Sequence, residues 1–293
     1  MRRAYVLVVL MTLGGLSIAA RVQPPAQQGS KVVEVEKLKD NLYMLKGGGG
    51  NTAVYVGANG VTVVDAKNPG WGQPILDKIK ELTPKPVTLL INTHTHGDHV
   101  SGNVEFPATV DIVVQENTKT NMEKMDIFRQ NNGKGMPKKT FKDTMTLGSG
   151  NDRVDLYYFG RGHTNGDAWI VFPALRLAHA GDIFSGKNLP LLDMNNGGSG
   201  VEIGESLAKA HAGIKGVDSI ITGHSTVMTW SDLDEYAQFN KDFLRDVRSA
   251  AASGKSADQF AATWKPANKY NGYNVQEARL KSNAEAVYKE IGK

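Results

Sequence analysis

Histidine and aspartate side chains crowd into one short window of the sequence, T-H-T-H-G-D-H at residues 93–99. The chain has seven histidines, and three of them, His94, His96 and His99, lie in this window with Asp98 between them. In an extended or turning segment, side chains two residues apart share a face, so His94 and His96 can point to one place. Asp98 and His99 follow in the next turn and can face a neighbouring point. Imidazole and carboxylate groups in such an arrangement are typical of metal ligands.

Three further candidate ligands each follow a stretch with the character of a β-strand. His163 lies in the glycine-flanked turn G-R-G-H-T-N-G, Asp182 follows A-H-A-G, and His224 lies in T-G-H-S. Loops at the ends of strands are where rigid scaffolds commonly present functional groups. The sequence therefore predicts two adjacent metal sites, with Asp182 able to bridge them through its two oxygens. The other predicted ligands of the two sites are His94, His96 and His163 on one side and Asp98, His99 and His224 on the other.

The metal is constrained by the kinds of ligand that the chain can offer. There is no cysteine in the sequence, so any metal site must be built from histidine and carboxylate. Such a set suits Zn(II), but also Fe or Mn, so the ligands alone leave the metal open. We expect two zinc ions per chain, one at each of the two predicted sites.

The elements that must position these residues are short strands and helices. Residues 32–65 contain β-type runs separated by turn residues, which indicates a meander of antiparallel strands. Apolar residues with helical spacing predict a helix at 71–82. An apolar strand at 87–92 ends where the histidine cluster begins. Further expected elements are strands at 112–114, 140–147, 153–159, 168–172, 176–180 and 218–222, and helices at 115–128 and 204–214.

The order of these elements predicts the organisation of the chain. A β-meander and helices recur in two halves, which implies layers of sheet covered by helices. No linker interrupts the pattern after residue 30, so we expect one domain over residues 31–293. Apolar residues on one face predict that its C-terminal part, residues 231–293, is largely helical.

The first thirty residues have a different character. Arg2 and Arg3 precede a short apolar run that ends in small residues, which is the pattern of a signal peptide over residues 1–20. The apolar run is short for a membrane span, so no stable membrane insertion is expected. Residues 21–30 form a polar Pro/Gln linker. The sequence thus predicts a periplasmic or secreted protein.

The charge of the chain excludes some classes of partner. The formal net charge is +4, and removal of Arg2 and Arg3 would leave 4 − 2 = +2. This charge is too small and too evenly spread to indicate binding to nucleic acid or to an anionic membrane surface. A small-molecule substrate is the expected partner, and the oligomeric state is left open.

The ordered set of candidate ligands resembles that of the metallo-β-lactamase superfamily over roughly residues 31–230. The family signature H-x-H-x-D-H reads here as His94, His96, Asp98 and His99. The later family ligands match, in order, His163, Asp182 and His224. Asp65 matches an early aspartate of the family that supports ligands and does not bind metal itself. The resemblance implies an α/β fold, a four-layer αββα sandwich, here with a helical C-terminal extension.

The resemblance also implies an activity, a hydrolase in which a metal-bound hydroxide attacks a carbonyl and Asp98 orients it. An ester, thioester, lactone or amide, including a β-lactam, would be the substrate. Members that hydrolyse β-lactams usually carry Cys or Ser where this chain has Asp182, which favours the glyoxalase II, lactonase, phosphodiesterase and persulfide dioxygenase branches. The alkyl sulfatase branch has a long dimerisation segment, for which this chain is too short. A true β-lactamase, a mononuclear iron persulfide dioxygenase and a non-catalytic metal-binding protein are the alternatives.

Other polar residues are expected to have structural roles. His179 should pack at the end of a strand with its side chain turned away from the loop of Asp182, and His211 should lie on the surface of a helix. Asp167 either supports a ligand or holds a turn.

Two glycine-rich segments are left with open roles. The 185–200 loop, S-G-K-N-L-P-L-L-D-M-N-N-G-G-S-G, either forms a wall of the cleft, where Lys187 can meet a substrate carboxylate, or is a solvated connector. G-G-G-G-N at 47–51 is expected to be a tight hairpin near the mouth of the site.

Overall fold

The computed structural model describes residues 31–293, which form one compact unit. The signal peptide expected at residues 1–20 and the linker expected at residues 21–30 lie outside the described residues. Within the described range, no helix has both the length and the apolar character that crossing a membrane requires.

Two β-sheets form the middle of the structure. The first sheet has seven strands in the order β1 to β7, antiparallel from β1 to β4 and parallel from β4 to β7. Its strands are β1 (Glu34–Lys39), β2 (Leu42–Lys46), β3 (Thr52–Val56), β4 (Val61–Val64), β5 (Val87–Ile91), β6 (Asp111–Gln115) and β7 (Lys139–Phe141).

The second sheet has six strands in the order β13-β12-β11-β10-β9-β8, and only the β11–β12 pair is parallel. Its strands are β8 (Thr144–Leu147), β9 (Val154–Tyr157), β10 (Trp169–Phe172), β11 (Leu177–Gly181), β12 (Ser219–Thr222) and β13 (Met228–Thr229).

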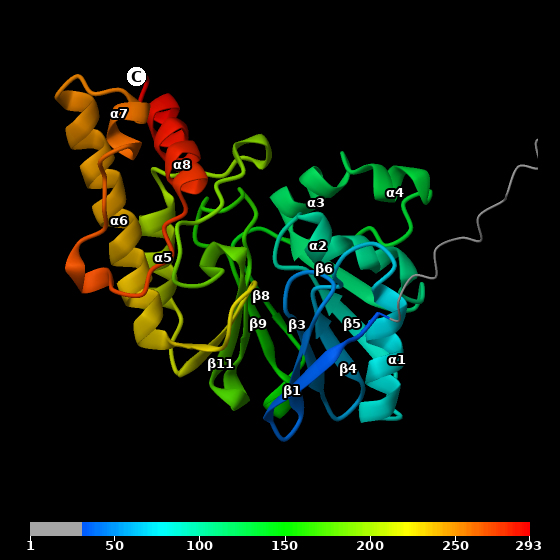
Figure 1. The fold of residues 1–293 in the computed structure, drawn as a ribbon. Coiled ribbons are helices and arrows are strands. Elements are labelled where there is room, and N and C mark those ends of the chain that lie inside the picture. The colour runs from blue at the N-terminus through cyan, green and yellow to red at the C-terminus, as the bar shows by residue number, and fades with distance from the viewer. Residues whose placement is uncertain (1–30) are drawn as a thin grey trace, which may run out of the picture. The chain divides into compact units, whose positions relative to one another are not determined.

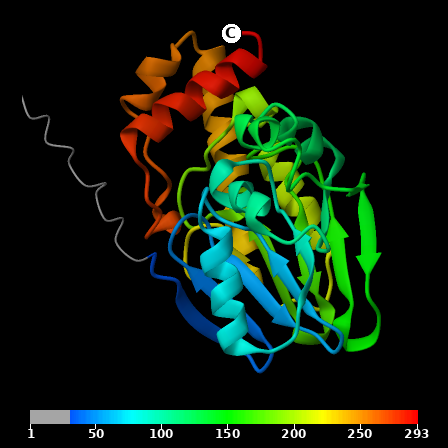
Figure 2. The same cartoon turned by 90° about the vertical axis from the view of Figure 1, so that its right-hand side faces the viewer.

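Helices cover the outer faces of both sheets (Figure 1). The longer ones are α1 (Gly72–Leu82), α5 (Ile203–Gly213), α6 (Trp230–Ala252) and α8 (Glu277–Glu290). The shorter ones are α2 (Gly97–Val100), α3 (Glu116–Met122), α4 (Asp126–Gln130) and α7 (Ala257–Ala261). Figure 2 shows the orange and red helices of the C-terminal part gathered at one end of the unit.

Apolar cores between and outside the sheets hold these layers together. Between the sheets, Met44 and Ile91 of the first sheet pack with Ile170 and Phe172 of the second. On the outer face of the first sheet, the core contains apolar residues of α1, and on the outer face of the second sheet it contains residues of α5, α6, α7 and α8. Full burial of each such side chain stabilises the fold by about 1.5–3 kcal/mol. The layer order is helix, sheet, sheet, helix, as expected.

Two elements differ from the sequence-based expectation. The helix expected at 115–128 is divided into α3 and α4 by a turn at Glu123–Met125. The strand expected at 140–147 is two strands, β7 and β8, which belong to different sheets. The chain crosses between the sheets at residues 142–143, and the apolar pattern does not reveal this because Phe141, Met145 and Leu147 follow one alternation.

The topology brings the predicted ligands to one place. Since β9, β10 and β11 are successive antiparallel neighbours and β12 is parallel to β11, the carboxyl ends of β9, β11 and β12 lie at the same edge of the second sheet. His163, Asp182 and His224 follow these three ends, and the 93–99 window follows β5 of the facing sheet.

Candidate metal centre

The seven residues expected to bind metal lie in two adjoining groups. Within each group the possible ligand atoms are all within 4.8 Å of one another. The first group is His94, His96, His163 and Asp182, and the second is Asp98, His99 and His224. The structure thus brings together every residue of the predicted set, and their role as ligands stays a prediction.

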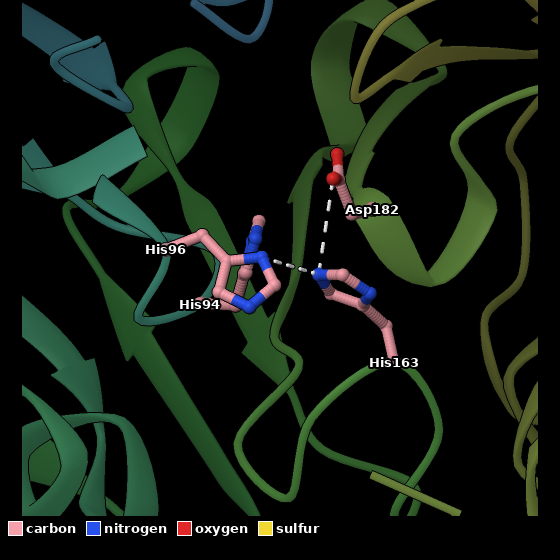
Figure 3. A group of neighbouring side chains, drawn as sticks. All are labelled: His94, His96, His163 and Asp182. Atoms are coloured by element: carbon pink, nitrogen blue, oxygen red, sulfur yellow. Dashed lines mark hydrogen bonds and ion pairs between the residues drawn. The ribbon is translucent and has the colours of Figure 1, made fainter. Parts of the chain in front are cut away.

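The imidazoles of the first group converge on one point, as Figure 3 shows. His163 Nε2 lies 2.9 Å from His96 Nδ1 and 3.8 Å from Asp182 Oδ2. The rings of His94 and His163 meet edge to face with centroids 4.6 Å apart. Burial lowers the pKa of His163 to about 4 and holds that of His94 well below its usual value. Both imidazoles are therefore neutral near pH 7, the form that binds a metal ion.

Unpaired buried atoms show that this group fits a metal ion. His94 Nε2 and Asp182 Oδ1 are buried, and neither has a hydrogen-bond partner among residues 31–293. A buried polar atom without a partner costs about 1–3 kcal/mol. A divalent cation between the two groups would satisfy both atoms, since neutral imidazole and carboxylate are its usual ligands. The residues present therefore fit a metal centre.

Two residues of the 185–200 loop hold the imidazoles of the first group. His96 Nε2 donates to Asp193 Oδ2 at 2.7 Å, and His163 Nδ1 donates to the carbonyl oxygen of Leu191 at 2.7 Å. These hydrogen bonds fix which ring nitrogen carries the proton and leave the other nitrogen free to bind a metal. The sequence reasoning missed both residues. The only local signal was the turn D-M-N-N, in which Asp193 Oδ1 accepts hydrogen bonds from the following backbone.

Asp65 supports both ligand groups through hydrogen bonds. Its carboxylate accepts hydrogen bonds from Thr93 N and Thr93 Oγ1 at 2.8 Å and from His99 Nδ1 at 2.6 Å. Because Thr93 Oγ1 donates to Asp65, it accepts from His94 Nδ1 at 2.9 Å. Asp65 is fully buried at a left-handed φ of 66°. It therefore orients one imidazole of each group, the supporting role that the family resemblance implied.

The second group is more open. The side chains of Asp98 and His224 are 30% and 41% exposed, whereas that of His99 is fully buried. His224 Nε2 lies 3.2 Å from both Asp98 Oδ2 and Asp182 Oδ2. Hydrogen bonds to Asp182 and Asp98 raise the pKa of His224 to about 9. A metal ion would have to displace this proton, and the two carboxylates would then bind the ion instead.

Glycines let the backbone approach these ligands closely. A β-carbon at Gly223 would stand 1.7 Å from Asp182 Oδ1, and one at Gly50 would stand 2.2 Å from the ring of His99. Side chains at these positions are therefore incompatible with the observed placement of Asp182 and His99.

The 47–51 segment fastens the loop of His224 to the first sheet. Asn51 Nδ2 donates to the carbonyl oxygens of Thr222 at 2.9 Å and Ser225 at 2.8 Å, and Asn51 N donates to that of Gly223 at 2.7 Å. All three acceptors flank His224. The segment is thus a tight turn at the site, as expected, and Asn51 has a positioning role that the sequence did not indicate.

A buried lysine also forms a hydrogen bond to the 47–51 segment. Lys67 is fully buried, and its Nζ donates to the carbonyl oxygens of Leu45 at 2.9 Å and Gly50 at 2.6 Å. Burial lowers its pKa to about 8, although Asp65 and Asp98 act in the opposite direction. Lysine is almost never fully buried, so sequence reasoning had no cause to place it here.

The remaining candidates are resolved by their contacts. His179 is buried outside both groups, where its Nδ1 accepts from Gly181 N at 3.1 Å, as expected for a packed residue. His211 lies on α5 with its ring stacked on Trp230, the centroids 5.5 Å apart. Asp167 has the turn role, because its carboxylate accepts from Thr164 N and Thr164 Oγ1.

The 185–200 loop forms a wall beside Asp182, one of the two roles left open for it. Lys187 does not point into that space. Its ammonium pairs with Asp232 at 2.8 Å and Glu235 at 3.1 Å, both on α6. The suggestion that Lys187 meets a substrate carboxylate is therefore wrong for this arrangement.

Two facing sheets covered by helices, with histidines and aspartates gathered at the strand ends, define an αββα fold with a candidate metal centre. The chain belongs to the metallo-β-lactamase superfamily, because the model of that family, described as "Metallo-beta-lactamase superfamily", matches residues 45–225. The predicted family is confirmed.

Relatives in two branches of the superfamily resemble the chain in sequence. It is 29% identical over 182 residues to a metallo-beta-lactamase type 2 of Elizabethkingia meningoseptica, covering 58% of this chain and 66% of that protein. It is 27% identical over 164 residues to a hydroxyacylglutathione hydrolase of Nostoc punctiforme, covering 54% of each. The chain thus spans just under two thirds of the first relative and about half of the second.

Solved structures share the fold. A metallo-beta-lactamase from Pontibacter korlensis has a TM-score of 0.60 at 19% identity, covering 72% of this chain and 99% of that one. The inverting sec-alkylsulfatase Pisa1 from Pseudomonas sp. has a TM-score of 0.71 at 13% identity, covering 88% of this chain and 50% of that one. At such identities the likeness shows the fold alone, and it confirms the predicted α/β sandwich.

Proposed function

We propose that this protein is an exported dinuclear zinc hydrolase that cleaves a carbonyl compound: an ester, thioester, lactone or amide. One observation carries the proposal. The carboxylate of Asp182 faces both ligand groups, with Oδ2 3.8 Å from His163 Nε2 and 3.2 Å from His224 Nε2, and Oδ1 3.4 Å from His99 Nε2. A carboxylate in this position can bridge two ions.

Two divalent ions held here would polarise the carbonyl and lower the pKa of bound water from about 15.7 toward 7. The residues of the chain orient the ligands and exclude water. Thr93, Asp193 and the Leu191 carbonyl keep the imidazoles of the first group in the tautomer that presents its free nitrogen to the ion. Burial of this group keeps bulk water away from that side of the centre.

Asp98 is the proposed catalytic residue. Burial raises the pKa of its carboxyl, but the hydrogen bond to His224 and the charges of His99 and His224 together outweigh burial, so the pKa lies below its usual value. The group is therefore ionised at neutral pH and accepts hydrogen bonds. Because its side chain is 30% exposed, it can contact a water molecule at the mouth of the centre, orient it and accept its proton.

The proposal is tested by metal content and hydrolysis together. Protein purified from its native compartment should contain about two zinc ions per chain by elemental analysis. A panel of esters, thioesters, lactones and β-lactams should show hydrolysis that a chelator abolishes and zinc restores. Lack of hydrolysis across the whole panel would contradict the proposal. One iron per chain with oxygen uptake on a persulfide would favour the dioxygenase alternative.

Export is a separate part of the proposal. Residues 1–20 support it, because they begin with two arginines, continue with a short apolar run and end in small residues. N-terminal sequencing of the mature protein should give a chain that begins at Arg21. An intact N-terminus in the cytoplasmic fraction would contradict it.

A further inference from the structure

A small cavity opens directly beside the second ligand group. Its volume is about 240 Å³, and Asp182 and His224 form the part of its lining that belongs to the metal centre. Leu189 and Leu191 of the 185–200 loop provide apolar surface, and Arg279 of α8 provides a guanidinium group. The cavity is small and open to solvent on one side, so it suits a short molecule or the short end of a longer one.

Arg279 is notable because its charge is not neutralised. It is half-buried, yet it forms no ion pair with any carboxylate among residues 31–293. Neighbouring cations of the same region are paired: Lys187 with Asp232, and Lys281, two residues along α8, with Asp258 at 2.8 Å. A guanidinium group presents its donors in a planar fork that matches a carboxylate.

Hydrogen bonds hold α8 in place against the 185–200 loop. Asn283 Nδ2 donates to the carbonyl oxygen of Pro190 at 2.9 Å, and Glu290 Oε1 accepts from Gly200 N at 2.8 Å. Between these anchors lies Leu191, whose carbonyl holds an imidazole of the first ligand group. The position of α8 relative to the candidate metal centre is therefore fixed by the loop and not by a flexible surface contact.

We propose that this cavity binds the carboxylate end of a short acyl substrate, and that Arg279 holds that carboxylate. The inference rests on the proposed hydrolase function and narrows its substrate class. The carbonyl carbon would lie at Asp182 and His224, and the short aliphatic chain against Leu189 and Leu191. In the reaction, water adds its oxygen to the acyl carbon, the bond to the leaving oxygen breaks, and that oxygen takes a proton.

Steady-state kinetics with two matched esters test the role of Arg279. The probes are mono-p-nitrophenyl glutarate, which carries a terminal carboxylate, and p-nitrophenyl butyrate, which does not. For Arg279→Gln we expect KM for the glutarate ester to rise about 10-fold or more with kcat little changed, because a hydrogen bond to a charged group contributes about 1.5–3 kcal/mol. KM for the butyrate ester should stay within about twofold, and Arg279→Lys should recover part of the loss.

The matched control is Lys281→Gln, which removes a charge from the same helix outside the cavity lining. It should leave both KM values unchanged. Equal losses with both esters in Arg279→Gln would show that the residue supports structure and not a carboxylate, and no change with either ester would also overturn the proposal.

A binding measurement separates this inference from the hydrolase proposal. Calorimetric titration of the zinc-loaded protein with disodium glutarate should show binding that weakens about 10-fold or more in Arg279→Gln. Such binding without hydrolysis of either ester would support the carboxylate site and contradict the hydrolase function. Glutarate binding that is absent, or equally strong in Arg279→Gln and in the unaltered protein, would overturn the carboxylate site whatever the protein hydrolyses.

Discussion

The two ligand groups of the centre differ in burial and in support. In the first group, each imidazole has a hydrogen-bond acceptor on the nitrogen that faces away from the centre. In the second, His99 has such a partner in Asp65, whereas His224 Nδ1 forms no hydrogen bond among residues 31–293. Asp98 and His224 are also partly exposed. The first group is thus preorganised and mostly buried, with His96 partly exposed, and the second is open to the cavity where a substrate would arrive.

This difference predicts that the first group binds its ion more tightly and that the second group, together with the cavity, determines what reacts. Oriented imidazoles lose little entropy on binding a metal, and hydrogen-bonded ones are stronger ligands. An exposed histidine has to be ordered, and His224 also has to lose the proton that its neighbouring carboxylates favour.

The largest effect should come from the residue that both groups share. Asp182→Ala removes the carboxylate that faces His163, His224 and His99, so occupancy of both sites should fall. Hydrolysis should fall by on the order of 10³-fold or more, since loss of a single stabilising donor at an active site already costs about 10²–10³-fold. Elemental analysis and kcat/KM measure the two effects.

The control for this variant is His211→Ala, whose side chain lies on α5 away from both groups. It should leave metal content unchanged. Equal metal losses in the two variants would mean that the assignment of the ligands is wrong.

Single-ligand variants separate the two groups. His224→Ala should retain roughly one ion per chain, because the first group keeps all its ligands and their partners. His163→Ala should lose the tightly held ion. We expect hydrolysis to fall by about 10²–10³-fold in both, with the larger loss in His163→Ala. Competitive metal titration with a chromogenic chelator gives the affinity at each site, and a tighter remaining site in His163→Ala than in His224→Ala would reverse the comparison.

Much of this centre could be predicted from the sequence because its ligands are marked by residue type and local spacing. H-x-H-x-D-H places four candidates in one window, and His163, Asp182 and His224 each follow a recognisable strand. Apolar periodicity predicted the strands, the helices and their layers, whereas the four-layer αββα order was implied by the family resemblance. The same periodicity could not show that residues 140–147 divide between two sheets, because Phe141, Met145 and Leu147 follow one alternation.

Apart from Asp65, which the family resemblance indicated, the supporting residues could not be predicted because their partners lie far away in the sequence. Asn51 contacts carbonyl oxygens that lie 171 and 174 positions away in the chain. Asp193 meets His96 across 97 positions, and Lys67 serves two carbonyl oxygens while fully buried. No local motif encodes such partners. Only the folded chain shows which polar side chains orient the ligands.

Asp193→Asn tests whether support explains the tighter binding expected of the first group. The amide keeps the size of the side chain, but in either orientation its Nδ2 faces a donor, which is His96 Nε2 on one side and the backbone amides of Asn195 and Asn196 on the other. Metal affinity of the first group should fall about 10–100-fold, as is typical when a partner of a ligating histidine is lost. The second group should be affected less. The same chelator competition, applied to both sites, measures these affinities. An unchanged metal affinity at the first group would show that hydrogen-bond support of its ligands does not explain its tighter binding.

The smallest effect should come from Asn51, which acts on the second group only through the backbone. Asn51→Ala leaves the carbonyl oxygens of Thr222 and Ser225 without their donor, at a cost of about 1–3 kcal/mol in the free energy of unfolding, measurable by denaturant titration. Asn51→Asp is the sharper variant, because it keeps the size and places a carboxylate against two carbonyl oxygens, so its loss of stability should be larger.

The same two variants show whether the loop of His224 needs this fastening in order to bind metal. If it does, the affinity of the second group should fall in both variants in proportion to the loss of stability, while the first group, whose partners lie on the 185–200 loop and at Thr93, keeps its affinity. A fall in metal affinity at the first group instead would mean that the two groups respond to the substitution as one rigid unit. The difference in support between them would then not govern how each holds its ion.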